Sequence, residues 1–341
     1  MTSITLSVLA EHIGADIDCD GSAVVVGLNT LENANAQQVS FLANKKYKSQ
    51  LADTNALAVI VSPKEAALIS GRALIMDNPY LGYAKAAQLL DNSPVPASTI
   101  HPTAFVDDSA VIGANVHIGP NATVDAEVVI GDDSSIGAGS YVGVGSSLGK
   151  GVTIKPNVTL YHHVVLGHGV TVHSNTVIGS DGFGFANDKG CWEKIPQVGR
   201  VVIGDGTDIG ASVTIDRGAL DDTTIGKGAI IDNQVQIGHN CQIGDYTAIA
   251  GASGIAGSTK VGNYCIIGGA VSMNGHIEIC DGVHITGNSM IAKSIDKPGV
   301  YSSGIPATDN REWRRGVNRY NQLGDLFKRV KSLEQHLNEP D

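Results

Sequence analysis

Few aromatic residues, unpaired cysteines and no long apolar run mark this 341-residue sequence, of which aromatic residues make up only 5%. The five cysteines form no CxxC pair, which argues against a disulfide framework or a zinc site and for free thiols in a reducing compartment. No apolar run is long enough to span a bilayer and no charged-then-apolar amino terminus is present, so we expect neither a membrane span nor a signal peptide, and a cytoplasmic location. The net charge of −11 argues against nucleic-acid binding.

A six-residue repeat of aliphatic side chains dominates the sequence. It runs from Ile100 to Ile178, returns at Ile203 and runs again from Ile225 to Ile291, filling 29 positions in all. With apolar residues at 42% of the chain, chance would produce this with a probability on the order of 10⁻¹¹. A period of six fits neither an α-helix nor a simple alternating strand, and it predicts a solenoid.

Three hexapeptides form one triangular coil, with the aliphatic side chains inside and small or polar residues at the corners. Neighbouring coils pair as parallel strands about 4.8 Å apart. The sequence therefore predicts a mainly β fold, a parallel β-helix of nearly ten coils. Its aliphatic core explains how the chain folds with so few aromatic residues.

Three regions follow from where the repeat begins and ends. Residues 1–95 lack it and are predicted to form a small α/β domain, with strands at 56–61 and 73–76 and helices at 6–13 and 81–90. The β-helix spans 100–295. A helix at 311–338 carries an apolar stripe from Trp313 to Leu337, which either lies on the prism or, as its heptad-like spacing favours, contacts copies from other subunits.

Two interruptions break the repeat, a long one between Ile178 and Ile203 and a shorter one between Ile215 and Ile225. Excursions from a regular scaffold are usual places for a functional site, although a tolerated surface insertion remains the alternative. Phe183, Phe185 and Trp192 in the first interruption favour a pocket wall or a subunit interface.

Four histidines cluster at 162, 163, 168 and 173. His163 and His168 have the HxxxxH spacing of some hexapeptide zinc enzymes. The positions two coils before them are Glu127 and Asp132, so the third imidazole is missing. We therefore expect histidines in solvated turns and no metal.

His239 has a different setting. Because three hexapeptides complete one coil, His239, Gly257, Gly275 and Lys293 form one column, and Asp232 lies about one hexapeptide before the histidine. A neutral histidine held by a carboxylate can act as a general base, a glycine amide can approach an oxyanion, and a cation can hold a phosphate. A corner histidine bonded to a backbone carbonyl is the equally weighted alternative.

The segments DGFGFAND, KIPQVG, TIDRGALDDTTIG, IDNQVQIGHN, GIAGS, GGAVSMNGH and YSSGIP closely resemble those of the UDP-3-O-(3-hydroxyacyl)glucosamine N-acyltransferases of lipid A biosynthesis. The resemblance covers essentially the whole chain. It implies a left-handed β-helix, a homotrimer with active sites between subunits, and no tightly bound cofactor. The implied reaction moves a 3-hydroxyacyl chain from the 4'-phosphopantetheine thioester of acyl carrier protein to the 2-amino group of a UDP-3-O-acylglucosamine.

The resemblance also implies residue roles. His239 matches the general base, Asp232 its orienting carboxylate and Gly257 the oxyanion contact, while His276 matches a supporting histidine. In the first domain Phe41, Asn44, Lys46 and Tyr47 fall in the uridine-binding segment, with both aromatic rings expected on the uracil; core packing of these rings is the alternative. Met290 resembles the residue that ends the acyl groove, and Lys293 stands where relatives often carry Arg.

The carboxy-terminal segment 311–331 carries a charge of +5 in an acidic chain, with Arg314 and Arg315 among its seven basic residues. Such a patch suits an acidic partner such as acyl carrier protein, and a solvated helix face is the alternative. Two rival functions are an acetyl-coenzyme A-dependent N-acetyltransferase acting on a nucleotide sugar and a non-catalytic binding module.

Overall fold

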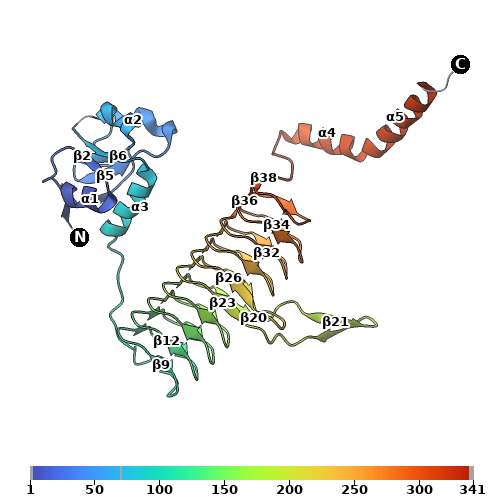
Figure 1. Ribbon diagram of the computed structural model, residues 1–341, viewed down its shortest axis with the longest axis horizontal. Helices are drawn as coiled ribbons and strands as arrows, with labels where there is room; N and C mark the ends of the chain where they lie inside the picture. Colours follow the sequence, from blue (N-terminus) through green and yellow to red (C-terminus); the bar gives the residue numbers. More distant parts are fainter. Residues whose placement is uncertain (1–2, 70, 338–341) are drawn as a thin grey trace. The chain divides into compact units, whose positions relative to one another are not determined.

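A computed structural model describes residues 3–69 and 71–337, and the chain divides into two compact units, Met1–Val95 and Pro96–Asp341 (Figure 1). Residues 1, 2 and 70 of the predicted first domain, and residue 338 of the predicted terminal helix, lie outside the described residues.

The first unit is a small α/β domain, as predicted. Its five-stranded sheet has the order β2 (Asp16–Asp18), β7 (Ala73–Ile75), β6 (Ala58–Val61), β5 (Gln38–Phe41), β4 (Gly27–Leu28), and β1 (Ile4–Thr5) pairs with β3 (Val24–Val25). The helices are α1 (Leu6–Ile13), α2 (Pro63–Ala66) and α3 (Pro79–Leu90), with 3-10 turns at Lys45–Leu51 and Ala67–Ile69. All four residues of β6 are buried, because both faces of this strand are covered.

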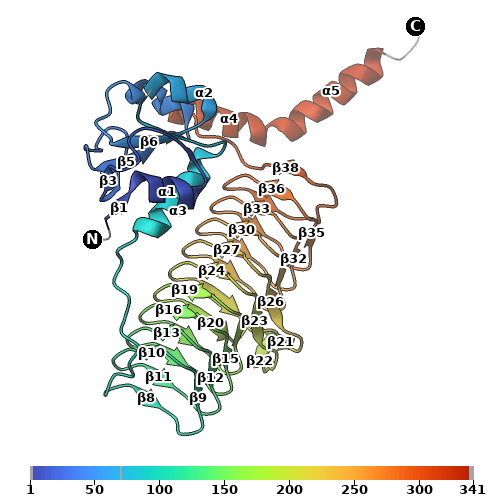
Figure 2. The same ribbon diagram turned by 60° about the vertical axis from the view of Figure 1, so that its left-hand side comes forward.

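The second unit contains a parallel β-helix with three sheets as its sides (Figure 2). Face 1 has ten strands: β8 (Phe105–Val106), β11 (Thr123–Val124), β14 (Tyr141–Val142), β17 (Thr159–Leu160), β20 (Val177–Ser180), β25 (Thr214–Asp216), β28 (Gln236–Ile237), β31 (Gly254–Ile255), β34 (Ser272–Met273) and β37 (Met290–Ile291). Face 2 has nine: β9 (Val111–Ile112), β12 (Val129–Ile130), β15 (Ser147–Leu148), β18 (Val165–Leu166), β23 (Val201–Ile203), β26 (Thr223–Ile225), β29 (Gln242–Ile243), β32 (Lys260–Val261) and β35 (Glu278–Ile279). Face 3 has ten: β10 (His117–Ile118), β13 (Ser135–Ile136), β16 (Thr153–Ile154), β19 (Thr171–Val172), β24 (Asp208–Ile209), β27 (Ile230–Ile231), β30 (Ala248–Ile249), β33 (Ile266–Ile267), β36 (Val283–Ile285) and β38 (Gly299–Tyr301).

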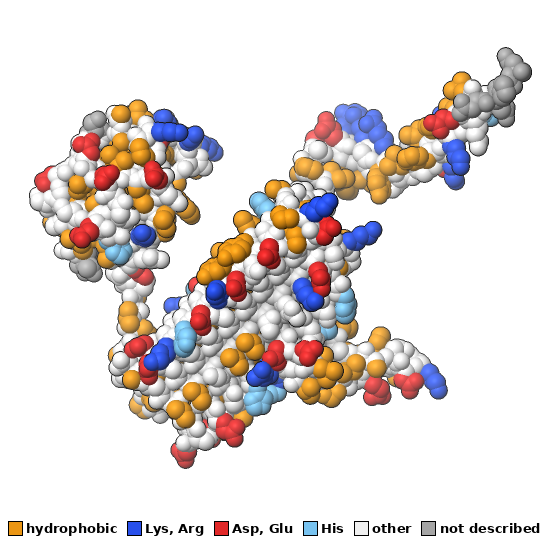
Figure 3. All heavy atoms as spheres, viewed as in Figure 1, with side chains coloured by type: hydrophobic (Ala, Val, Ile, Leu, Met, Phe, Trp, Pro, Cys, Tyr) orange, Lys and Arg blue, Asp and Glu red, His pale blue; other side chains and the backbone are white. Residues whose placement is uncertain are grey.

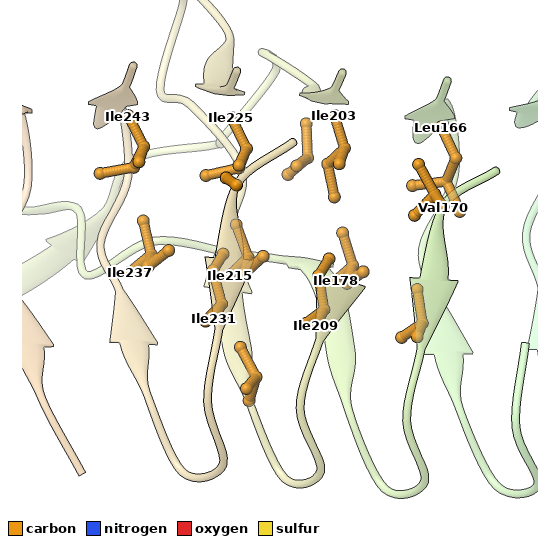
Figure 4. Packing of buried hydrophobic residues seen from close by; sticks show 14 of the residues in the cluster. Leu166, Val170, Ile178, Ile203, Ile209, Ile215, Ile225, Ile231, Ile237 and Ile243 are labelled. Atoms are coloured by element: carbon orange, nitrogen blue, oxygen red, sulfur yellow. The ribbon is translucent and has the colours of Figure 1, made fainter. Parts of the chain in front are cut away.

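The second aliphatic residue of each short strand points into the prism, where equivalent residues of successive coils stack. Ile203, Ile225 and Ile243 form one such row and Ile178, Ile215 and Ile237 another (Figure 4). These six side chains are at most 3% exposed. The six-residue period therefore identified the core correctly.

Buried hydroxyl groups tie the coils together inside the corners. Ser146 Oγ donates to the carbonyl of Tyr161 at 3.0 Å and accepts the amide of Val164 at 3.1 Å. Ser140 and Ser134 make the same pair of bonds one and two coil sides earlier. Each small polar side chain thus satisfies backbone groups that the tight turn leaves without a ladder partner.

The first interruption is a β-hairpin made of β21 (Phe185–Asp188) and β22 (Cys191–Lys194). Its flanking residue Phe183 is 87% exposed and Trp192 is 68% exposed, and Figure 3 shows apolar side chains along this projection. The second interruption is a short loop between β25 and β26. After both of them the coils regain register, since Leu166 pairs with Ile203 across the first and Ile215 pairs with Ile237 across the second.

The carboxy-terminal segment forms two helices where the sequence predicted one. Helix α4 (Asn310–Asn321) begins with the Asp309 cap and helix α5 (Leu323–Leu337) follows after Gln322. Their apolar side chains are exposed, among them Phe327 at 73% and Leu333 at 64% (Figure 3). None of the helices in the described part of the chain is long and apolar enough to cross a bilayer.

Candidate active site

The predicted column forms along the edge between faces 1 and 2. His239 follows β28, Gly257 follows β31, Gly275 follows β34 and Lys293 follows β37, and these strands pair in register from one coil to the next. Lys293 is exposed, and no carboxylate of the described residues forms an ion pair with it. The edge thus presents a histidine, two glycines and a free cation in a line.

His239 and Gly257 are in contact across one coil. A Cβ added to Gly257 would lie 2.7 Å from His239 Nε2, so Nε2 faces the glycine backbone. Among the described residues, none accepts a hydrogen bond from the Gly257 amide. The partly exposed His239 therefore lies against a glycine whose N–H donor is unused, a pair of groups that suits general-base and oxyanion chemistry.

Asp232 does not hold His239 within one chain, and this part of the sequence-based expectation is wrong. Asp232 follows β27 on face 3 and lies at the edge between faces 3 and 1, so the whole of β28 separates it from His239. Its carboxylate accepts the amide of Gly251 at 3.0 Å and that of Asn233 at 2.7 Å. The His239 Nδ1 atom instead lies 2.9 Å from Asn240 Oδ1.

The two interruptions supply the surroundings of His239. A Cβ at Gly182, in the first interruption, would lie 2.5 Å from His239 Cβ and 3.0 Å from Gln197 Oε1, so this loop packs directly on the histidine. Asp216, at the start of the second, interacts electrostatically with His239. Burial raises the pKa of the Asp216 carboxyl, while hydrogen bonds from Ser180 and Gln236 oppose that rise.

Arg217 lies in the same edge, between Ser180 and His239 in the stack of coils. It is 1% exposed, its guanidinium contacts the His162 ring and donates to the His162 carbonyl at 2.6 Å, and its Nε atom has no partner among the described residues. Burial and the Arg217 charge lower the pKa of His162. The sequence signalled Arg217 and Asp216 only as members of an interruption in the repeat.

Two further predicted residues, His276 and Met290, lie in coils beyond His239. The His276 amide donates to the Gly257 carbonyl at 3.1 Å, and its backbone has a φ of 58°. Met290 is 62% exposed on β37. Both residues therefore follow the line from His239 toward Lys293, while Arg314 and Arg315 lie exposed on α4.

The predicted uridine segment borders a pocket of about 410 Å³ in the first unit. Phe41, Asn44 and Tyr47 line it, and Phe41 stacks on Tyr83 with ring centroids 4.0 Å apart. Lys46 is not part of the lining, and its amide donates to Asn44 Oδ1 at 3.0 Å. Leu42 and Ala43 of the same segment also line it, and the lining residues that the sequence did not predict are Thr30, Leu31, Glu32, Asn33, Gln50 and Tyr80.

A second hollow, of about 490 Å³, lies on face 3. Ile230, Ile266 and Ala248 form its apolar floor, and Asp232 and His173 stand at its border. This hollow and the His239 edge lie on different sides of the prism in one chain.

Of the four clustered histidines, only His162 and His163 are in ring contact among the described residues, with centroids 5.4 Å apart, and His162 also meets Arg217. His168 Nδ1 accepts the amide of Lys150 at 2.9 Å, and His173 is 3.9 Å from Asp208. In the described ranges, His, Cys, Asp and Glu form no group of three or more that could hold a metal ion.

Comparisons with known proteins identify the family of the chain. Residues 22–89 match the family model for UDP-3-O-(3-hydroxymyristoyl) glucosamine N-acyltransferase, residues 95–178 that for the GMPPB C-terminal domain, and residues 222–257 that for six bacterial transferase hexapeptide repeats. The UDP-3-O-acylglucosamine N-acyltransferase of Pseudoalteromonas translucida is 58% identical over 100% of both chains. The enzyme of the same name from Coxiella burnetii is 48% identical over 97% of both chains.

A solved structure shows the same fold. The Arabidopsis UDP-N-acetylglucosamine acyltransferase aligns with a TM-score of 0.55 at 22% identity, over 64% of this chain and 77% of that chain. At this identity the likeness supports the β-helix architecture alone.

Proposed function

Because the chain belongs to the UDP-3-O-acylglucosamine N-acyltransferase family, acyltransferases of lipid A biosynthesis, we propose that it acylates the 2-amino group of UDP-3-O-(3-hydroxyacyl)glucosamine. The acyl donor is a 3-hydroxyacyl thioester on the 4'-phosphopantetheine arm of acyl carrier protein, and no tightly bound cofactor or metal takes part. The product is a UDP-2,3-diacylglucosamine.

The contact between His239 Nε2 and Gly257 carries this proposal. The amine nitrogen attacks the thioester carbonyl, and Nε2 takes the proton that the nitrogen loses. The carbonyl oxygen becomes an oxyanion and accepts the unused Gly257 N–H. The tetrahedral intermediate then expels the thiolate, which receives the proton from the imidazolium.

The rest of the edge fits an extended pantetheine arm. Lys293 lies three coils beyond His239, about 14 Å away at the strand spacing, and holds the phosphate. The acyl chain passes Met290, which is exposed where the groove would end. His276 supports this path from its place beside Gly257.

We propose further that the protein is a homotrimer. The exposed apolar side chains of α5 and the apolar hollow of face 3 would be covered by other copies. Such an assembly buries the face 3 hollow, with Asp232 at its border, against another copy.

Substrate recognition is divided between the two units. The pocket of the first unit takes the uridine, with Phe41, Tyr47 and Asn44 at its wall. The basic α4–α5 segment, with Arg314 and Arg315 exposed, steers acyl carrier protein. An acetyl-coenzyme A-dependent N-acetyltransferase would use the same histidine, but it would need neither the basic segment nor the groove to Met290.

The test compares wild-type protein with His239→Ala in acyl transfer from 3-hydroxyacyl carrier protein to UDP-3-O-acylglucosamine. A rate lower by about 10² or more, with fold and oligomer intact, supports the reaction and the base. His101→Ala, which changes an exposed histidine of the first coil, is the matched control and should retain the rate. Activity with acetyl-coenzyme A in place of the carrier protein would favour the rival enzyme, and full activity of His239→Ala would refute the proposed base.

A further inference from the structure

We propose that the side-chain amide of Asn240 fixes the tautomer of His239, so that Nδ1 carries the proton and Nε2 is the basic atom. This inference deepens the proposed function, since it rests on His239 acting as the general base. Asn240 is a positioning residue, because it contacts the base and not the substrate.

The Asn240 side chain is held by contacts on both of its ends. Its Nδ2 donates to the carbonyl of Asp221 at 2.9 Å, and its Oδ1 accepts the amide of Ala219 at 3.0 Å. Its own backbone amide donates to Thr223 Oγ1 at 2.8 Å. Three separate bonds therefore hold the residue in place.

These partners define which end of the amide is the oxygen. If the amide were turned over, Nδ2 would face the Ala219 N–H and Oδ1 would face the Asp221 carbonyl, which gives one donor pair and one acceptor pair. The orientation follows from two backbone groups that cannot exchange roles. The oxygen must therefore face Ala219, and with it His239.

The fixed Asn240 oxygen determines which nitrogen of His239 carries the proton. Its Nδ1 lies 2.9 Å from Asn240 Oδ1, an atom that can only accept, so Nδ1 must donate. In a neutral imidazole the other nitrogen then carries the lone pair. That nitrogen, Nε2, is the one that faces Gly257, where the reaction is proposed to occur.

The second interruption of the repeat provides the bracing. Ala219 and Asp221 both belong to the loop between β25 and β26. Gly218 lets this loop fold tightly, because a Cβ there would collide with the Asp221 carbonyl and lie 2.9 Å from Asn240 Nδ2. A regular hexapeptide would place neither backbone group beside Asn240.

A neutral amide also has a consequence for pH dependence. A carboxylate on Nδ1 favours the charged imidazolium, whereas an amide oxygen selects the tautomer with much less effect on proton affinity. The charged group near His239 in this structure is Asp216 from β25, and the loop residues Gly182 and Gln197 that pack around it are neutral. Asn240 thus keeps the base oriented and free to accept a proton.

Two substitutions separate these roles. Asn240→Gly suits the backbone, since Asn240 has a φ of 59°, and it removes the amide. We expect kcat to fall about tenfold or more with the KM of both substrates changed less than about threefold, because the wrong tautomer becomes accessible. Asn240→Asp keeps an oxygen against Nδ1 but turns its second oxygen toward the Asp221 carbonyl, so it should lower the Tm, and its charge should move the acid limb of the kcat/KM profile to higher pH.

Asn263→Ala is the matched control. Asn263 also braces neighbouring coils, accepting the Asp245 amide at 2.7 Å and donating to Asp281 at 3.2 Å, but it lies at the edge between faces 2 and 3. It should lose stability and keep kcat. If the kcat of Asn240→Gly stays within about twofold of wild type, the proposal is wrong.

A second measurement is independent of turnover. The ¹⁵N spectrum of the full-length protein labelled in histidine, with His239→Ala for assignment, shows which nitrogen of His239 carries the proton. A protonated Nδ1 in wild type supports the proposal and a protonated Nε2 overturns it. Should His239→Ala remain active, the proposed function would fail while this spectrum still reports on Asn240.

Discussion

The His239 ring lies so close to Gly257 across one coil of the prism that a Cβ added to the glycine would come within 2.7 Å of Nε2. The glycine is required by this close approach and not by its backbone conformation, because its φ is outside the left-handed region. In the proposed reaction the amide of this glycine donates to the oxyanion.

Replacing Gly257 with Ala should abolish most activity while leaving the fold intact. The added Cβ would stand 2.7 Å from Nε2 and displace either the imidazole or the substrate carbonyl. We expect kcat for acyl transfer to fall by about 10² or more, as for loss of one oxyanion donor. Steady-state kinetics and a thermal melt of the same preparation check this.

Gly254→Ala is its control on the same strand pair. A Cβ at Gly254 meets no atom within 4 Å. This variant should have the Tm of wild type and a kcat within about twofold of the wild-type value. Equal losses in both variants would mean that the strand, and not the contact with His239, is sensitive.

Tyr47→Ala should weaken binding of the UDP-sugar. Tyr47 lines the pocket of the first unit and is 47% exposed, so its ring is available to stack on a base. Stacking of a base on an aromatic side chain contributes about 1–3 kcal/mol, which predicts a KM about five- to a hundredfold higher. Tyr264→Ala, at an exposed tyrosine on the prism, should leave KM unchanged. Calorimetric titration with UDP would contradict the assignment if Tyr47→Ala bound UDP as wild type does.

Charge reversal at Arg314 and Arg315 should slow the reaction with acyl carrier protein. Both side chains are exposed on α4, so they contribute to the field without supporting the core. We expect Arg314→Glu/Arg315→Glu to raise KM for the carrier protein by about tenfold and to reduce its dependence on salt. Lys189→Glu on the hairpin is the control, and a short pantetheine thioester should react equally with all three proteins. An unchanged KM for the carrier protein would place its docking surface elsewhere.

Stability should fall below about pH 6.5 in a way that depends on His162. Burial and the Arg217 charge lower the pKa of His162 in the folded protein from 6.5. As pH falls through 6.5 the unfolded chain therefore binds a proton that the folded chain does not, and the folded state loses stability. Thermal melts at pH 7.5 and 5.5 should show His162→Gln gaining relative to wild type at the lower pH. A difference in Tm that is the same at both pH values would contradict this, and His101→Gln gives the background for replacing an exposed histidine.

The repeat predicted most of the fold because one side chain in six must be buried for coils to stack. The same arithmetic placed Gly257, Gly275 and Lys293 in one column with His239, as the strand pairing shows. Asp232 was misplaced because its separation from His239 equals one whole side of the prism, and the chain turns a corner in between. A distance in sequence within a coil does not give a distance in space.

Asn240, Asp216 and Arg217 could not be predicted to surround His239, because their positions depend on how two irregular loops fold. The period stops at those loops, and nothing in it specifies that Ala219 and Asp221 would meet Asn240. In the first unit the segment Phe41–Tyr47 was identified by resemblance, whereas Tyr80 and Tyr83 come from a helix much later in the chain. The break between α4 and α5 at Gln322 likewise leaves the apolar spacing unchanged, so the periodic pattern did not predict it.

The stacked coils also fix the distances between residues along the edge of the prism. Because each coil advances the edge by about 4.8 Å, the gap between the base and the distal cation can change only in whole steps of that size. Deleting one complete coil between His239 and Lys293 would shorten the distance between them by one coil step and keep every side chain facing its original direction. Deleting only one or two of the three hexapeptides in a coil would instead rotate Lys293 onto another face. Evolution can therefore change the distance between His239 and Lys293, to suit a longer or shorter carrier arm, only by adding or removing whole coils.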